Sequence, residues 1–363
     1  MEVRIIRNGI TLIEVLVVLT LIVILLGLLL PAISASREAN RRTECINKMH
    51  QLGLAMHNFA MTNNSFPPSS TMTTTGGTLR SVDGWSFLVK VMPFMDYTQL
   101  YRRVNMSAPP LTLLAKGDSA TITYSNELNP DFICPSNSNS RFLNPSSTPS
   151  VDAFTNYKAM SATTEASLEI CVDPSGKPPY GKIEQHPDGA LFPGKYLPLA
   201  DFKVGGLSHT IALMETQDDK YSRWLVGAEA SLVGLPPAFN KTLVEDPKMP
   251  YYYPSMFDGK FGEDSAVAKS GLRTFLDYDF SPAGKDYGAY AKNNAGDPDW
   301  DTTIPNTYMY GPSSGHPAVI VSCYADGNAS GISKRVDAAC LFFLIRRGGE
   351  KPDNIIWRDV GGF

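Results

Sequence analysis

The sequence lacks an excess of charge of either sign. Charged residues make up 19% of the chain, and 32 Lys plus Arg stand against 36 Asp plus Glu, for a formal net charge of -4. A nucleic-acid-binding protein usually presents a basic surface to the phosphates, so we expect no nucleic-acid partner. We also expect no G-x-S-x-G nucleophile elbow, and Walker, H-E-x-x-H and G-x-G-x-x-G motifs are missing. An enzymatic interpretation therefore has no residues to name, and we expect no catalytic activity and no cofactor.

Cysteine is sparse, and no two cysteines form a C-x-x-C pair. This spacing argues against a zinc ribbon or a thioredoxin-type redox centre. Export would permit disulfides, but the sequence does not fix their connectivity, and burial as small apolar residues is an equal alternative for several cysteines. The five are Cys45, Cys134, Cys171, Cys323 and Cys340.

What the sequence does contain is an apolar run over residues 10–30, ITLIEVLVVLTLIVILLGLLL. As a helix rising about 1.5 Å per residue, this run is long enough to cross the hydrocarbon layer of a membrane. A secretory signal peptide would have a shorter run and a small-residue cleavage site, whereas Pro31 leads into more helical sequence. The run therefore predicts a retained membrane-spanning helix.

Glu14 is the one ionisable residue of this run. A carboxylate in the membrane costs several kcal/mol unless it is paired or protonated, so Glu14 is a candidate functional residue. The alternative is that Glu14 lies near the interface and reaches water.

Residues 9–14, GITLIE, resemble the processing site of type IV prepilins and pseudopilins, with Ile10 where that family usually has Phe. The resemblance implies that residues 1–9 are a leader, and that a prepilin peptidase cuts after Gly9 and methylates Ile10. Glu14 would then pair with the terminal amine of a neighbouring pilin-like subunit and set the register of assembly. The implied location is the inner membrane, crossed once, with a cytoplasmic N-terminus and a periplasmic or extracellular head.

Pro31 matches a recurrent proline of the type IV pilin helix. It removes the hydrogen bond to the carbonyl of Gly27, so we expect a kink. By the resemblance, this region loosens on assembly; the alternative is an ordinary proline of a membrane helix.

Residues 31–62 predict an amphipathic continuation of the same helix. Apolar residues recur at spacings of three and four, which places them along one face, and the Asn/Ser/Pro cluster at 63–68 ends the helix. A spine from residue 10 to 62 would be on the order of 80 Å long. The apolar positions are Ile46, Met49, Leu52, Met56 and Phe59.

A second resemblance covers nearly the whole chain. Residues 37–66, which include Arg42, Cys45 and His57, are similar to the segment after the membrane helix in a family of prepilin-like bacterial proteins. The head of that family is classed as a domain of unknown function, and its C-terminal signature is H-x(9)-D-G. Here His316 is followed, after residues 317–325, by Asp326 and Gly327.

His316 and Asp326 flank an apolar run that predicts a buried strand, and Asp-Gly is a strong turn signal. We expect a structural role for both residues. The alternative is a metal site or a base and its orienting carboxylate. The segment after the turn, residues 328–331, is polar and does not by itself predict a second strand.

The region from 217 to 307 is rich in Tyr and Asp and is interpreted as a loop-rich insertion on the head. Within it, Asp297, Asp299 and Asp301 alternate as Ca²⁺ ligands do, although Thr302 and Tyr308 stand where an EF-hand has Gly and Glu. Calcium is therefore a secondary hypothesis for this segment.

These observations predict an α+β fold, with a long N-terminal helix packed on an antiparallel sheet in a head formed by residues 63–363. The predicted function is that of a structural prepilin-like or pseudopilin-like subunit that assembles through its helix into a filament linked to secretion or the cell surface. The first alternative is a membrane-anchored extracytoplasmic domain that binds a glycan or protein ligand and does not polymerise, and the second is a tethered hydrolase.

Overall fold

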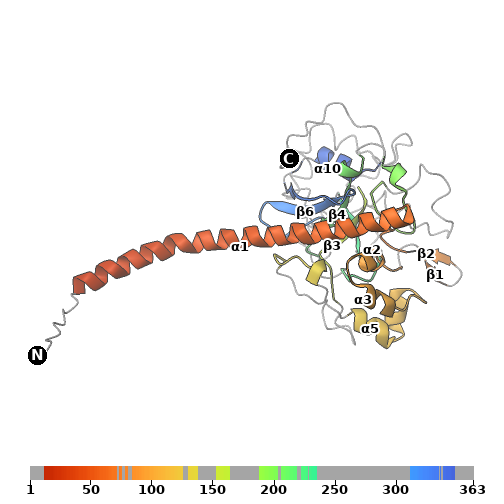
Figure 1. Ribbon diagram of the computed structural model, residues 1–363, viewed down its shortest axis with the longest axis horizontal. Coiled ribbons are helices and arrows are strands. Elements are labelled where there is room, and N and C mark those ends of the chain that lie inside the picture. The colour runs from red at the N-terminus through yellow and green to blue at the C-terminus, as the bar shows by residue number, and fades with distance from the viewer. Residues whose placement is uncertain are drawn as a thin grey trace, which may run out of the picture.

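The computed structural model describes residues 12–71, 73–75, 78–80, 84–125, 130–137, 153–163, 188–202, 206–218, 222–227, 229–234, 311–334, 336 and 338–347. One helix and one sheet dominate these residues (Figure 1).

Helix α1 (Leu12–Asn63) is a single helix of 52 residues. Its first part projects away from the head, and its last part lies across the sheet (Figure 1). The predicted apolar face is the face that docks, because four of its five positions are buried and Ile46 is partly buried against the core. The helix ends at Asn63, and the next residue, Asn64, adopts a left-handed backbone with φ of 54°. Pro67 and Pro68 follow.

The sheet has five strands in the order β5-β3-β4-β6-β7. Three neighbouring pairs are antiparallel, and the edge pair of β3 and β5 is parallel. The predicted α+β class, with the helix packed on the sheet, is confirmed, and the parallel edge makes the sheet mixed. The strands are β3 (Tyr157–Ala162), β4 (Ile211–Glu215), β5 (Ser231–Val233), β6 (Val319–Tyr324) and β7 (Ala329–Ser333).

Strands β6 and β7 form a hairpin that packs against α1. The polar sequence at 328–331 did not predict β7, so the structure corrects this point. Main-chain hydrogen bonds pair the two strands over the register Val319↔Ser333 to Cys323↔Ala329, and these bonds do not depend on apolar side chains. On β7, Ile332 is buried, and the partly buried Ala329 packs against the core.

Smaller elements complete the head. α10 (Ala338–Ile345) contacts β4, and α2 (Phe87–Val91) and η1 (Met92–Phe94) contact α1. The remaining described elements are β1 (Thr73–Thr75), β2 (Thr78–Arg80), α3 (Thr98–Arg103), α4 (Pro110–Ala115), α5 (Ser119–Ser125), η2 (Pro130–Phe132), η4 (Leu199–Asp201) and η5 (Leu207–His209).

Candidate functional site

The projecting part of α1 is apolar and exposed. Every residue from 12 to 37 is exposed to the surroundings of the chain, and among the described helices α1 alone is long and apolar enough to cross a membrane. Glu14 lies in its first turn, and the helix continues through Pro31 with a gentle curve (Figure 1). Two of the predicted site residues, Glu14 and Pro31, therefore lie on the exposed apolar part of α1.

Other predicted positions lie outside the described residues. They are Gly9 and Ile10 of the processing site, the acidic positions Asp297, Asp299 and Asp301, and most of the 217–307 region. The processing site and the calcium site therefore remain predictions from the sequence.

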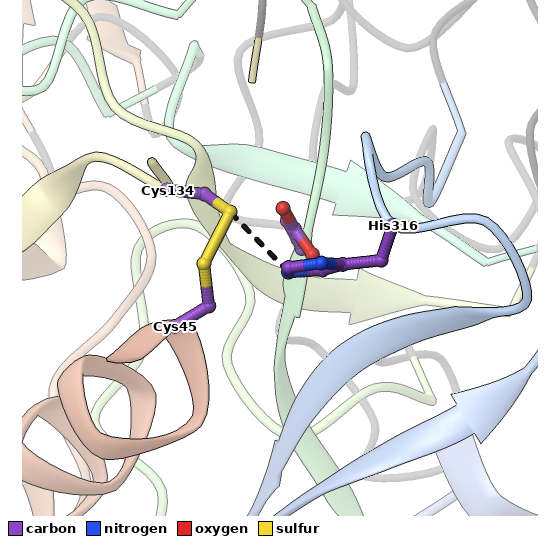
Figure 2. A group of neighbouring side chains, drawn as sticks. Cys45, Cys134 and His316 are labelled. Carbon is purple, nitrogen blue, oxygen red and sulfur yellow. Dashed lines mark hydrogen bonds between the residues drawn. A yellow bond between two sulfur atoms is a disulfide. The ribbon is translucent and has the colours of Figure 1, made fainter. Parts of the chain in front are cut away.

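A disulfide joins α1 to the head. Cys45, on the buried face of the helix, is bonded to Cys134, which follows η2 and is 89 residues further along the chain (Figure 2). The N–H of Cys134 donates to the side-chain oxygen of Asn156, which directly precedes β3, at 2.9 Å. The bond therefore links the spine helix to the loop that packs beside the sheet. Cys323 is a buried free thiol, as the apolar alternative expects.

His316 connects the start of the β6 segment to α1. Its Nδ1 lies 2.5 Å from Oε1 of Glu38 on the helix, and its Nε2 lies 3.5 Å from Sγ of Cys134. The imidazole is 1% exposed, and it points toward the disulfide (Figure 2). His316 therefore contacts α1 through Glu38 and the head through Cys134. We call this region, around the Cys45–Cys134 disulfide, the helix–head junction.

Glu38 accepts several hydrogen bonds at the edge of this junction. Burial raises the pKa of its carboxyl, but hydrogen bonds from His316, Arg41 and Ser136 outweigh that effect and hold the pKa below its ordinary value. Glu38 is therefore an anion that holds the imidazole and the loop after Cys134 against α1.

The Asp-Gly end of the signature forms the turn of the β6–β7 hairpin. The N–H of Gly327 donates to the carbonyl of Tyr324 at 2.9 Å, and Gly327 has a left-handed φ of 89°. Oδ1 of Asp326 accepts the N–H of Asn328 at 2.9 Å. Asp326 therefore caps the turn with its side chain.

The same turn contacts α1 at a second point. A methyl group added at Gly53 of the helix would lie 2.8 Å from Cα of Gly327 and 2.4 Å from Sγ of Cys323. His50, one turn earlier, has Nδ1 2.7 Å from the carbonyl oxygen of Gly327.

His316 and Asp326 flank the six-residue strand β6, whose ends lie roughly 17 Å apart at about 3.3 Å per residue. They do not form a common site, and each end of the signature contacts α1 separately.

We expect Gly53→Ala to lower the free energy of unfolding of the head by about 1–3 kcal/mol, because backbone atoms of Gly327 must move. Helix propensity alone would change stability by about 1 kcal/mol in the opposite direction. The measurement is urea unfolding of the full chain in detergent micelles. Gly27→Ala is the matched control, since nothing lies within 4 Å of that position. Equal stability of both variants would show that the contact is not tight.

Glu215, at the end of β4, places a carboxylate beside His316 and the Cys45–Cys134 disulfide. Its Oε2 accepts hydrogen bonds from Oγ of Ser314 at 2.7 Å and from the N–H of Val321 at 3.4 Å. Ligand atoms of Cys45, Cys134, Glu215 and His316 all lie within 4.8 Å of one another, and all four residues are buried. Among the described residues, this group is the one that could hold a metal ion.

Residues 311–315, GPSSG, match the letters of the G-x-S-x-G nucleophile motif, so the prediction that the sequence holds no such segment is wrong as to the letters. Here the segment leads into strand β6, whereas a nucleophile elbow leads from a strand into a helix. Oγ of Ser313 accepts the N–H of Gln217 at 2.8 Å and donates to the carbonyl of Gly311 at 3.3 Å. These serines organise the loop before β6.

Comparison with known proteins identifies the family. Residues 34–339, most of the chain, match the family described as "Protein of unknown function (DUF1559)", and the chain belongs to that family. The predicted membership of a family with a head of unknown function is confirmed, whereas residues 9–14 lie outside the match. No curated protein and no solved structure matches this chain.

Proposed function

We propose that this protein is a structural pilin-like subunit without catalytic activity. In this proposal a prepilin peptidase cleaves it after Gly9 and methylates Ile10, and the inner membrane holds it with its head outside the cytoplasm. Other pilin-like subunits pack against α1 to form a filament linked to secretion or to the cell surface.

The observation that carries the proposal is the continuity of α1 from an exposed apolar segment into the core of the head. Lipid or neighbouring apolar helices must cover the exposed segment, because its contact with water is unfavourable. A membrane anchor by itself requires no rigid connection to its head. Here one helix runs into the head and is fixed by a disulfide, a hydrogen bond between Glu38 and His316, and the Gly53 contact. A rigid junction of this kind suits a subunit that must hold its head in a fixed position.

Glu14 supports the assembly step. An ionised carboxylate in the membrane is costly unless an opposite charge compensates it, and in an assembled filament a cationic group from another subunit would do so only in the correct register. By the resemblance stated above, this cation is the methylated amine of Ile10 of a neighbour.

We expect Glu14→Ala to reduce crosslinking between subunits, in cells that contain the processing enzyme, by at least about tenfold. Breaking a buried ion pair costs several kcal/mol, and about 1.4 kcal/mol corresponds to a factor of ten. The matched control is Glu44→Ala on the same helix, since the Glu44 side chain is 54% exposed and pairs with Lys48. This control should crosslink as the native protein does.

Mass spectrometry of the mature N-terminus tests the processing step separately. A methylated Ile10 is expected. An intact leader would contradict the proposal. A methylated Ile10 with no effect of Glu14→Ala on crosslinking would favour a membrane-anchored head that does not polymerise.

A further inference from the structure

The junction contains four metal-ligating side chains from four separate segments. Cys45 lies on α1, Cys134 follows η2, Glu215 ends β4, and His316 precedes β6. Their exposed fractions are 0–1%, and their ligand atoms lie within 4.8 Å of one another. A buried junction held only by a disulfide does not require an imidazole and a carboxylate beside the sulfur atoms.

The ligand set fits a tetrahedral zinc site. Two thiolates, one imidazole nitrogen and one carboxylate oxygen are donors that zinc uses. With usual bond lengths of about 2.3 Å to sulfur and about 2.0 Å to nitrogen, a sulfur and a nitrogen ligand lie roughly 3.5 Å apart in a tetrahedron. Sγ of Cys134 and Nε2 of His316 are 3.5 Å apart (Figure 2).

The surrounding hydrogen bonds also match a metal site. A histidine that binds zinc usually donates its other ring N–H to a carboxylate, which fixes the tautomer and directs the lone pair at the metal. His316 has this arrangement, with Nδ1 at 2.5 Å from Glu38 and Nε2 directed at Cys134. The Glu215 carboxylate is likewise held by Ser314.

We propose that these four residues bind one zinc ion when the Cys45–Cys134 disulfide is reduced. A dithiol or phosphine reductant supplies two electrons, and two protons are taken up as the S–S bond breaks to give two thiols. Zinc then displaces both thiol protons to solvent and bonds to both sulfur atoms. The sulfur atoms separate from a disulfide bond length of about 2.0 Å to roughly 3.8 Å. The junction is thus closed by a disulfide under oxidising conditions and by zinc under reducing conditions.

Cobalt binding to the full chain in detergent micelles tests this proposal, because Co²⁺ replaces zinc and is visible spectroscopically. After phosphine reduction, we expect one Co²⁺ per chain, with a thiolate-to-cobalt charge-transfer band and the visible bands of tetrahedral cobalt, all abolished by Zn²⁺. The oxidised protein should show none of these bands.

Variants separate this site from other thiols. His316→Gln and Glu215→Gln remove direct ligands, and Glu38→Gln is expected to weaken cobalt binding about 10–100-fold by the loss of the histidine's partner. Cys323→Ser is the matched control and should leave the spectrum unchanged, because Cys323 is a free thiol outside the group.

Two results would overturn the proposal. One is a reduced chain with native far-ultraviolet circular dichroism and no cobalt band, and the other is a band that His316→Gln does not weaken. If reduction alone unfolds the head, zinc added during refolding must restore the native circular dichroism, and failure to do so also overturns the proposal.

Discussion

The double variant Cys45→Ala/Cys134→Ala is expected to lose about 4–5 kcal/mol of unfolding free energy. The two cysteines are 89 residues apart, and in the chain-entropy account a crosslink over such a loop stabilises the folded state by roughly that amount. Urea unfolding of the full chain in micelles, followed by tryptophan fluorescence, measures the effect. Trp224 reports on the core because it is buried beside Phe132, with ring centroids 5.9 Å apart.

Cys323→Ala provides the control for this prediction. It also removes a fully buried sulfur atom, but it breaks no crosslink, so we expect a loss of about 1 kcal/mol. Burial raises the pKa of the Cys323 thiol well above its ordinary value, so this residue stays protonated and does not exchange with the disulfide. If the double variant were no less stable than Cys323→Ala, the disulfide would contribute nothing to the fold.

The sequence predicted the spine because its signals are local. The apolar run, the three-and-four spacing of Met49, Leu52 and Met56, and the proline-rich end at 67–68 are each read within a few turns of helix. The structure has α1 over Leu12–Asn63 with that face buried. β7 was missed because its pairing comes from the neighbouring strand β6, and its own side chains are mostly polar.

The partners within the site could not be predicted, because they come from distant parts of the chain. His316 was recognised as part of a signature, but its partner Glu38 is 278 residues earlier. Glu38 has no local feature that separates it from other helix-surface acids. The choice of Cys134 as the partner of Cys45 likewise depends on how the η2 loop packs beside the sheet.

The contacts of His316 with Glu38 and of Gly327 with Gly53 explain the spacing of the H-x(9)-D-G signature. Glu38 and Gly53, the contacts of the two ends, are 15 residues apart on α1 (53 minus 38), or roughly 22 Å. The segment from His316 to Gly327 must therefore run beside that length of helix, and strand β6 forms its middle. This geometry accounts for a fixed number of residues between the histidine and the Asp-Gly turn without requiring the two ends to share chemistry.

A buried ion pair in the sheet gives the other large expected effect. Nζ of Lys158 on β3 lies 2.7 Å from Oδ2 of Asp218, which follows β4, and both side chains are 0% exposed. Lys158→Met would leave the Asp218 carboxylate without this counter-charge in a medium of low dielectric constant. We expect it to lower the unfolding free energy by about 3–5 kcal/mol, measured by urea unfolding as above.

The double variant Lys158→Met/Asp218→Asn separates the charge from the packing. It removes both charges, so it should be more stable than Lys158→Met alone, by at least about 1 kcal/mol. Glu44→Gln is the matched single change at an exposed carboxylate, since the Glu44 side chain is 54% exposed and pairs with Lys48, and it should cost no more than about 0.5 kcal/mol. If Lys158→Met cost as little as Glu44→Gln, the buried pair would not be needed to join β3 to the end of β4. The large cost expected here follows from burial, because the same pairing at the surface is screened by water.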